Sequence, residues 1–158
     1  MRKNAKTKKQ HYVNNADFLA ALIKHREDVE IAEKQGKPKP IVNNYIGSCF
    51  LKIATHLSYR PNFINYMYKD DMVCDGIENC IQYIDNFDPA KSKNPFAYFT
   101  QIVYYAFLRR IAKEKRQMDI KDKIIEKSGF DQVFHSDGDG DTAQLNSIKS
   151  RIEMNNRY

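Results

Sequence analysis

The chain has 158 residues, of which 42% are hydrophobic and 29% charged, and its formal net charge is +6. This length predicts one compact domain with tails, and the 12% aromatic content argues against wholesale disorder. Three cysteines without a CxxC pair disfavour a disulfide scaffold or a zinc site, and no apolar run approaches membrane-spanning length, so we expect a cytoplasmic protein.

The N-terminal part predicts a flexible basic arm followed by two helices. Residues 1–12 carry five bases and no acid. The first helix is expected from Asn15 or Asp17, either of which can cap it, to near Gly36, and the second from about 42 to 58. His25 and His56 stand alone on these helices, which favours packing or surface positions over metal ligation. Apolar residues at helical spacing predict the buried stripes: Phe18, Leu19, Leu22, Ile23 and Val29, then Ile46, Phe50, Ile53, Ala54 and Leu57.

A third helix is expected from about residue 69 to 86, with two faces of opposite character. Residues 70–88 carry six acids and no base. The predicted core face contains Val73, Ile77, Cys80, Ile81 and Ile84, with Phe87 at its end. The predicted opposite face contains Asp71, Asp75, Glu78, Gln82 and Asp85. A solvated surface is the usual meaning of such a stripe, and a docking face for a basic partner is the competing interpretation.

The fourth helix should begin with Asn94 as its N-cap and Pro95 at its first position, and should end near residue 118. Residues 91–116 carry seven bases and one acid. One stripe suits the core and contains Phe96, Phe99, Val103 and Phe107. A second stripe contains Tyr98, Ile102, Tyr105, Arg109, Lys113 and Arg116. Because it interleaves aromatic rings with cations, this second stripe suits bases and phosphates.

The C-terminal part carries weaker signals. Ile120, Ile124 and Ile125 could extend the fourth helix or start another, and a last short helix is expected at about 142–155. The Gly/Asp run at 137–141 predicts a flexible loop, because a calcium loop would need Gly where Thr142 stands and Glu where Ile148 stands. No phosphate-cradling glycine loop, HExxH or GxSxG is present, so we expect no catalytic site, metal or cofactor.

The sequence therefore predicts an all-α fold, a small helical bundle, with three parts. Residues 1–12 form the basic arm, 13–118 the helical domain, and 119–158 a less ordered C-terminal extension with the Gly/Asp loop.

Three segments resemble region two of bacterial sigma factors: DMVCDG at 71–76, DNF at 85–87 and FAYFT at 96–100. The runs VNNADFLAALIKHRED, DGIE, NFDPAKSKNPFAYFTQ and RRIAKEKR resemble, more specifically, the late-promoter sigma factors of T-even-type phages over about residues 12–118. This resemblance implies the region-two helical domain and a role in initiating transcription.

The resemblance also implies two binding surfaces. The acidic helix would dock on the clamp coiled coil in the largest subunit of the host RNA polymerase core, and the fourth helix would bind promoter DNA. Tyr98 matches the residue against which a flipped adenine stacks. Gln101 and Ile102 stand where housekeeping sigma factors carry two Trp, and Tyr104 and Tyr105 are candidates to replace them. The expected polymerase-binding residues are Asp71, Cys74, Asp75, Glu78, Asn79 and Gln82. The expected DNA-binding residues are Tyr98, Gln101, Ile102, Tyr104, Tyr105, Arg109, Lys113 and Arg116.

The leading interpretation is a sigma factor for phage late transcription in an infected bacterial cell. It would bind host core polymerase, recognise a TATA-like late promoter element and help to melt it. The alternative is a basic DNA- or polymerase-binding regulator that does not itself initiate. The family also works with a late coactivator and a sliding clamp, but the C-terminal sequence SIKSRIEMNNRY is basic and lacks the family's apolar-acidic clamp-binding motif.

Overall fold

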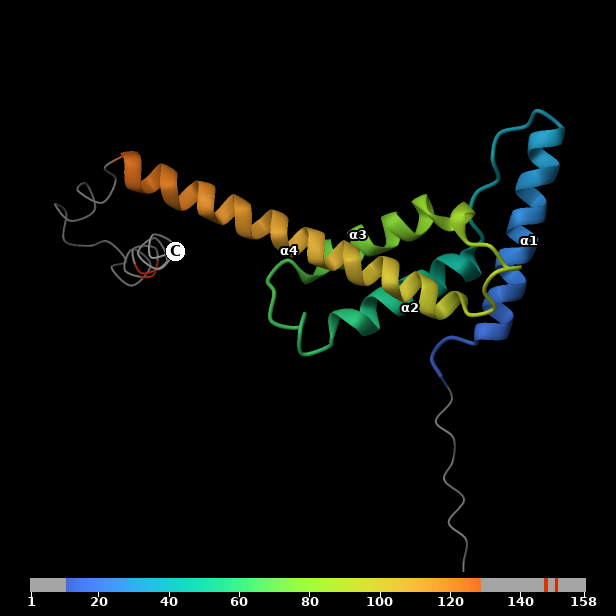
Figure 1. Cartoon of the computed structure of the whole chain (residues 1–158), viewed down its shortest axis with the longest axis horizontal. Coiled ribbons are helices and arrows are strands. Elements are labelled where there is room, and N and C mark those ends of the chain that lie inside the picture. The colour runs from blue at the N-terminus through green and yellow to red at the C-terminus, as the bar shows by residue number, and fades with distance from the viewer. Residues whose placement is uncertain (1–10, 129–146, 148–149, 151–158) are drawn as a thin grey trace, which may run out of the picture. The chain divides into compact units, whose positions relative to one another are not determined.

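The computed structural model describes residues 11–128, 147 and 150, and every regular element in this part of the chain is helical (Figure 1). The predicted all-α class is therefore confirmed. The elements are α1 (Asn15–Lys34), α2 (Asn44–Ser58), α3 (Lys69–Gln82), the short 3₁₀ helix η1 (Ile84–Asn86) and α4 (Pro95–Ser128). None of the helices described in these residues is long and apolar enough to cross a membrane.

The chain divides into two units, Met1–Arg110 and Ile111–Tyr158. The first unit contains α1, α2, α3, η1 and the first half of α4; the second contains the rest of α4. Most of the basic arm, at 1–10, and the Gly/Asp loop at 137–141 lie outside the described residues. Of the helix expected at 142–155, only Ser147 and Ser150 are described, and both are helical.

Asparagine side chains start α1 and α2. Asn14 accepts hydrogen bonds from the backbone amides of Ala16 and Asp17, at 3.0 and 3.4 Å, so the predicted cap at Asn15 or Asp17 is wrong. Asn15 is used elsewhere: its Oδ1 accepts a hydrogen bond from the backbone N–H of Phe96, 3.2 Å away in the first turn of α4. That amide has no partner within its own helix, so Asn15 joins the starts of α1 and α4.

The end of α1 and the start of α2 follow from local conformation. Gly36 has a φ of 63°, the left-handed conformation that its position after α1 predicts. Asn43 caps α2, and its Oδ1 accepts from the backbone N–H of Tyr45 at 3.0 Å. Because residue 43 caps the helix, α2 begins at Asn44, two residues after the expected start at about 42.

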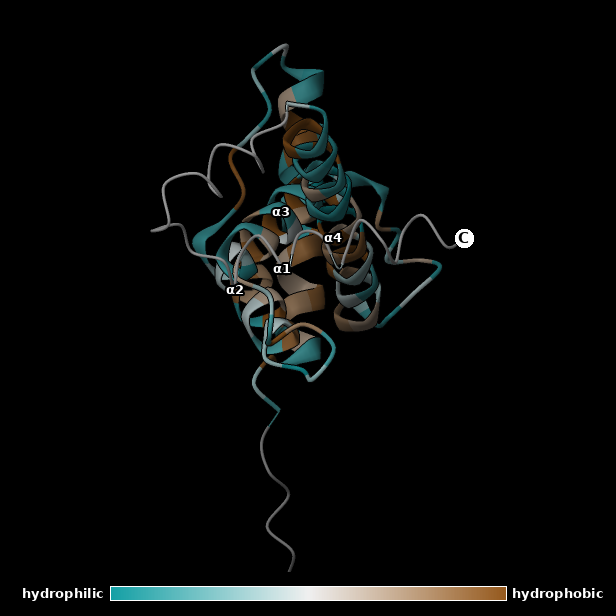
Figure 2. Ribbon diagram, turned by 90° about the vertical axis from the view of Figure 1, so that its left-hand side faces the viewer, coloured by the Kyte–Doolittle hydropathy of each residue, from teal (hydrophilic) through white to brown (hydrophobic). Residues whose placement is uncertain are grey.

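An aromatic cluster forms the core of the first unit. Phe18 of α1, Phe50 of α2 and Phe99 of α4 are fully buried, and their ring centroids lie 4.7–6.0 Å apart. Figure 2 shows hydrophobic ribbon where these helices come together. The stripe predicted for α2 is confirmed, since all five residues are buried. Ile23 of the α1 stripe is exposed, because the buried line of α1 runs through Phe18, Leu22 and His25 and Ile23 lies one residue to its side.

The buried face of α3 differs from the predicted face. Met72, Gly76 and Cys80 form its buried line, whereas Val73 and Ile77 are half-buried and Ile81 is exposed. A glycine explains the difference. A Cβ atom on Gly76 would lie 3.0 Å from Cγ1 of Val103 and 3.3 Å from Cε1 of Phe107. Gly76 thus lets α4 approach α3 closely, and the contact centres on the glycine instead of on the larger apolar residues.

The N-terminus of α4 is confirmed, with Asn94 Oδ1 accepting from the backbone N–H of Ala97 at 3.1 Å. The helix ends ten residues later than predicted, at Ser128 and not near 118, so Ile120, Ile124 and Ile125 extend it. No glycine or proline interrupts residues 96–128, and Gly129 follows directly. The predicted domain end at 118 therefore lies within a continuous helix, and the two units divide at 110.

Candidate nucleic-acid interface and docking face

An acidic line runs along the solvent side of α3. Asp71, Cys74, Glu78 and Gln82 are all exposed, and their spacing of three, four and four places them on one side of the helix. We call these four residues the α3 outer face. The structure thus brings together four of the six residues expected to bind polymerase, in a surface that holds two carboxylates, a thiol and an amide.

Asp75 and Asn79, the other two expected residues, bind within the protein. Asp75 Oδ2 accepts from Arg110 Nε at 2.6 Å, and Oδ1 accepts from Nη2 at 3.0 Å. The side chains of Asp75 and Arg110 are only 30% and 18% exposed. Asn79 donates from Nδ2 to the backbone carbonyl of Asp75, 2.8 Å away. This bidentate ion pair links α3 to α4 within the first unit.

The solvent side of α4 carries aromatic rings and a cation. Gln101, Tyr104, Tyr105 and Arg109 are exposed and share one side of the helix, which we call the α4 aromatic face. Tyr105 is 50% exposed and Tyr104 is 39% exposed. The Tyr104 ring meets Phe63 edge-on, with centroids 5.7 Å apart, and its other ring neighbour is Tyr105 at 5.8 Å.

Tyr98 and Ile102 are less exposed to solvent than the residues of the α4 aromatic face. Both are half-buried. The Tyr98 ring lies 5.2 Å from the ring of buried Phe87 and 5.1 Å from that of Phe99, so its inner side is packed. Burial raises the pKa of the Tyr98 phenol, and nearby Cys80 raises it further. The phenol is therefore a hydrogen-bond donor near neutral pH, with part of its ring accessible.

Lys113 and Arg116, the last two residues expected to bind DNA, are exposed on the part of α4 that belongs to the second unit. The residues expected to bind DNA that lie in the first unit are Tyr98, Ile102 and the α4 aromatic face, in which Arg109 is an exposed cation.

Sequence reasoning missed an aromatic cluster at the N-terminus of the domain. Tyr12 stacks on His56 with ring centroids 3.8 Å apart and planes 3° apart, and it meets Phe96 edge-on at 5.6 Å. Burial raises the pKa of Tyr12, and the charge of Arg60 opposes this shift. Residues 11 and 12, expected in the flexible arm, therefore pack against α2 and α4. The signal in the sequence is the aromatic pair His11-Tyr12 directly before buried Val13.

Among the described residues, no group of three or more His, Cys, Asp or Glu side chains is placed to hold a metal ion. The three cysteines are free thiols, with Cys74 exposed and Cys49 and Cys80 buried.

No protein-family model matches the sequence, and no curated protein is significantly similar to it.

Proposed function

We propose that this protein is a sigma factor for phage late transcription that works in the cytoplasm of an infected bacterium. The observation that carries the proposal is the pairing of two unlike surfaces on consecutive helices. The α3 outer face is acidic, and the α4 aromatic face presents two exposed tyrosines beside Arg109. The identity of the two partners comes from the sequence resemblance to region two of sigma factors.

In this proposal, the α3 outer face docks on the clamp coiled coil of the host core polymerase. Asp71 and Glu78 supply negative charge without an ion pair to any described residue. Complementary charge of this kind speeds association and excludes wrong partners. Asp75 contributes indirectly, because its pair with Arg110 holds α3 against α4.

The first half of α4 captures unpaired bases of the promoter's non-template strand. A base stacked on an aromatic side chain gains roughly 1–3 kcal/mol, and flipping a base out of the duplex costs a few kcal/mol. Stacking on one or two tyrosines therefore offsets the unpairing of an AT-rich step without any covalent chemistry. Arg109 adds attraction for phosphate, so binding to DNA should weaken steeply with salt.

Run-off transcription with purified core polymerase tests the proposal. The template carries a TATA-like late promoter element, and the matched control carries a GC-rich replacement at the same place. We expect a transcript of defined length from the first template alone, and only when the protein is present. Binding to polymerase and to DNA without that transcript would contradict the proposal.

The alternative is a basic regulator that binds polymerase or DNA and does not initiate. One observation favours it: Ile102 is half-buried. By the resemblance, Gln101 and Ile102 stand where housekeeping sigma factors carry the Trp wedge. A regulator would change the yield from a host sigma factor's promoter and give no transcript with core polymerase alone.

A further inference from the structure

An apolar groove of about 550 Å³ lies in the first unit, where the segment that connects α1 to α2 meets the end of α3. It is lined by residues 39–44, by Gly47 of α2, by Ile81 of α3 and by Ile84 of η1. Most of its surface is apolar. One water molecule occupies about 30 Å³ in the liquid, so the groove has room for a whole side chain.

Two isoleucines that line this groove remain in contact with solvent. Ile41 is 93% exposed and Ile81 is 45% exposed. A single exposed apolar side chain is common on protein surfaces, but two that line one apolar groove form a patch. Apolar patches of this kind mark surfaces that a partner covers.

Gly47 is a second and independent indication that a partner approaches the groove. A glycine within a helix costs stability relative to alanine. Gly36 is the one described residue with a positive φ, so the backbone conformation of Gly47 does not require a glycine. A Cβ atom on Gly47 would meet no atom within 4 Å, so packing inside the chain does not require one either, in contrast to Gly76. The bare backbone at Gly47 leaves this part of α2 open to a close contact from outside.

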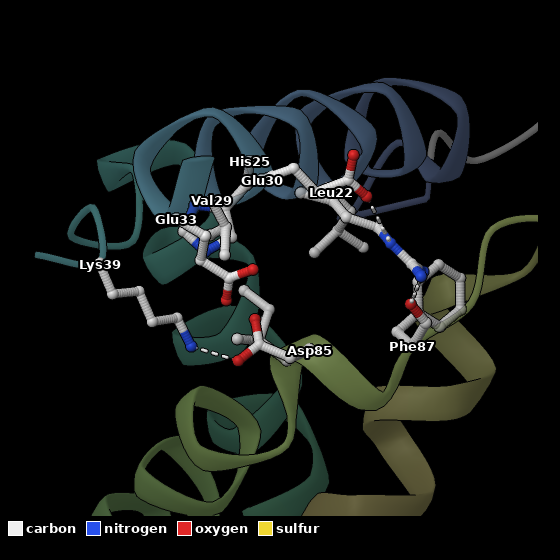
Figure 3. A pocket seen from close by; sticks show the side chains of 10 residues that line it. Leu22, His25, Val29, Glu30, Glu33, Lys39, Asp85 and Phe87 are labelled. Carbon is white, nitrogen blue, oxygen red and sulfur yellow. Dashed lines mark hydrogen bonds and ion pairs between the residues drawn. The ribbon is translucent and has the colours of Figure 1, made fainter. Parts of the chain in front are cut away.

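The groove adjoins the α3 outer face. Ile81 follows Glu78 by three residues and Cys74 by seven, and this spacing places the three side chains next to one another on the surface of α3. Lys39 is the one cation that lines the groove, and it pairs with Asp85 (Figure 3). The charge beside the groove is therefore the negative charge of the α3 outer face, which suits a partner that carries a base next to an apolar side chain.

We propose that this groove receives an apolar side chain of the polymerase segment that docks on the α3 outer face. The inference rests on the proposed function and adds the chemistry of the partner. The docking segment carries bases opposite Asp71 and Glu78, and beside them a large apolar residue that packs against Ile41 and Ile81 and over Gly47. The charges speed association, and the removal of apolar surface from water adds affinity.

Filling the groove tests the proposal, with purified core polymerase as the probe and fluorescence anisotropy of the labelled full chain as the measurement. Gly47→Leu is expected to weaken binding by about tenfold, because its side chain occupies the space of the partner's residue. Ala20→Leu adds the same bulk at an exposed position of α1 outside the groove and should bind normally. Ile81→Asn should give a similar loss. Its matched control is Ile64→Asn, which changes an isoleucine of 46% exposure that does not line the groove.

The outcomes separate this inference from the proposed function. If the unmodified protein does not bind core polymerase, the proposed function fails and the inference fails with it. If the unmodified protein binds, and Gly47→Leu and Ile81→Asn bind as tightly as their controls, the groove inference alone is overturned. Because the space around Gly47 is open, Gly47→Leu should fold normally, and urea denaturation checks this.

Photocrosslinking identifies what enters the groove. Benzophenone maleimide on the exposed thiol of Cys74 labels the α3 outer face, since Cys49 and Cys80 are buried. Ile41→Cys combined with Cys74→Ser moves the label to the groove. We expect both labels to crosslink to the same segment of core polymerase. Crosslinks of the groove label to a different polymerase subunit, or to a second copy of this chain, would overturn the proposal.

Discussion

The α3 outer face and the α4 aromatic face differ in how far their side chains pack against the rest of the protein. Asp71 and Glu78 project into solvent, so their charges can be changed with little effect on packing. The aromatic residues of α4 are partly built into the fold, since Tyr104 packs on Phe63 and Tyr98 on Phe87. An acidic surface can therefore be tested by simple charge reversal, but an aromatic surface only at positions such as Tyr105 that lie away from the core.

Reversing the charge of the α3 outer face should have the largest effect. Asp71→Lys combined with Glu78→Lys is expected to weaken binding to core polymerase by about 100-fold, because like charges would then face a basic partner. Fluorescence anisotropy with labelled protein measures the dissociation constant. The matched control, Glu27→Lys with Asp28→Lys, makes the same charge change on exposed positions of α1 and should bind normally. Similar losses of affinity in both double variants would mean that binding depends on the net charge of the protein and not on the α3 outer face.

A large side chain at Gly76 should separate α3 from α4. Gly76→Leu is expected to lower the free energy of unfolding by roughly 2–3 kcal/mol, because Val103 and Phe107 leave no room for it. Gly47→Leu is the control, since a Cβ there meets no atom within 4 Å. Urea denaturation measures both, and an equal loss in the two variants would argue against the close contact.

The Asp75–Arg110 pair should matter for stability more than the exposed Lys39–Asp85 pair. Asp75→Asn is expected to cost roughly 1.5–3 kcal/mol, as loss of hydrogen bonds to a charged group does. Asp85→Asn should cost at most about 1 kcal/mol, since both side chains of that pair are about half exposed. If Asp75→Asn leaves stability unchanged but removes polymerase binding, Asp75 acts directly in docking.

On the α4 aromatic face, Tyr105→Ala should weaken binding to single-stranded promoter DNA by about tenfold, the effect of losing one stacked base. The free energy of unfolding of this variant should change little, because the Tyr105 residue is 50% exposed. Tyr45→Ala on α2 is the control, a tyrosine of similar exposure outside the face. Equal DNA binding by the two variants would remove Tyr105 from the interface.

The smallest expected effect is a pH dependence of the free energy of unfolding, which arises from the Cys80 thiol. Burial raises the pKa of the Cys80 thiol from 9.0 to about 12. The neutral thiol is favoured in the folded state, so its contribution is complete below pH 9 and is lost as the pH rises towards 12. Between pH 8 and pH 10 the free energy of unfolding should fall by about 1.3 kcal/mol from this group. Cys80→Ala should show a correspondingly smaller fall in the same urea titrations, and an identical fall would contradict the assignment.

The sequence predicted most of the fold because its strongest signals are local. Helical spacing identified the buried residues of α2, and Asn94-Pro95 identified the start of α4. The errors arose where tertiary contact outweighed local pattern. The close approach of α4 at Gly76 gives α3 a different buried face from the predicted one. Asn15, a predicted cap of α1, instead accepts a hydrogen bond from the first turn of α4.

The candidate surfaces were predictable only in part, for the same reason. Spacing identified the exposed line through Asp71 and Glu78, but not the turn of Asp75 towards Arg110, because the two residues are 35 positions apart.

The central claim is that α3 holds the polymerase and α4 opens the promoter. Run-off transcription from duplex and pre-melted versions of one late promoter tests it most directly. We predict that pre-melting partly restores transcription by Tyr105→Ala, because the cost of unpairing no longer has to be offset, although the lost stacking contact still weakens binding to the open strand. We predict no such rescue of the Asp71→Lys, Glu78→Lys double variant. Rescue of both variants, or of neither, would contradict the division of roles between the two helices.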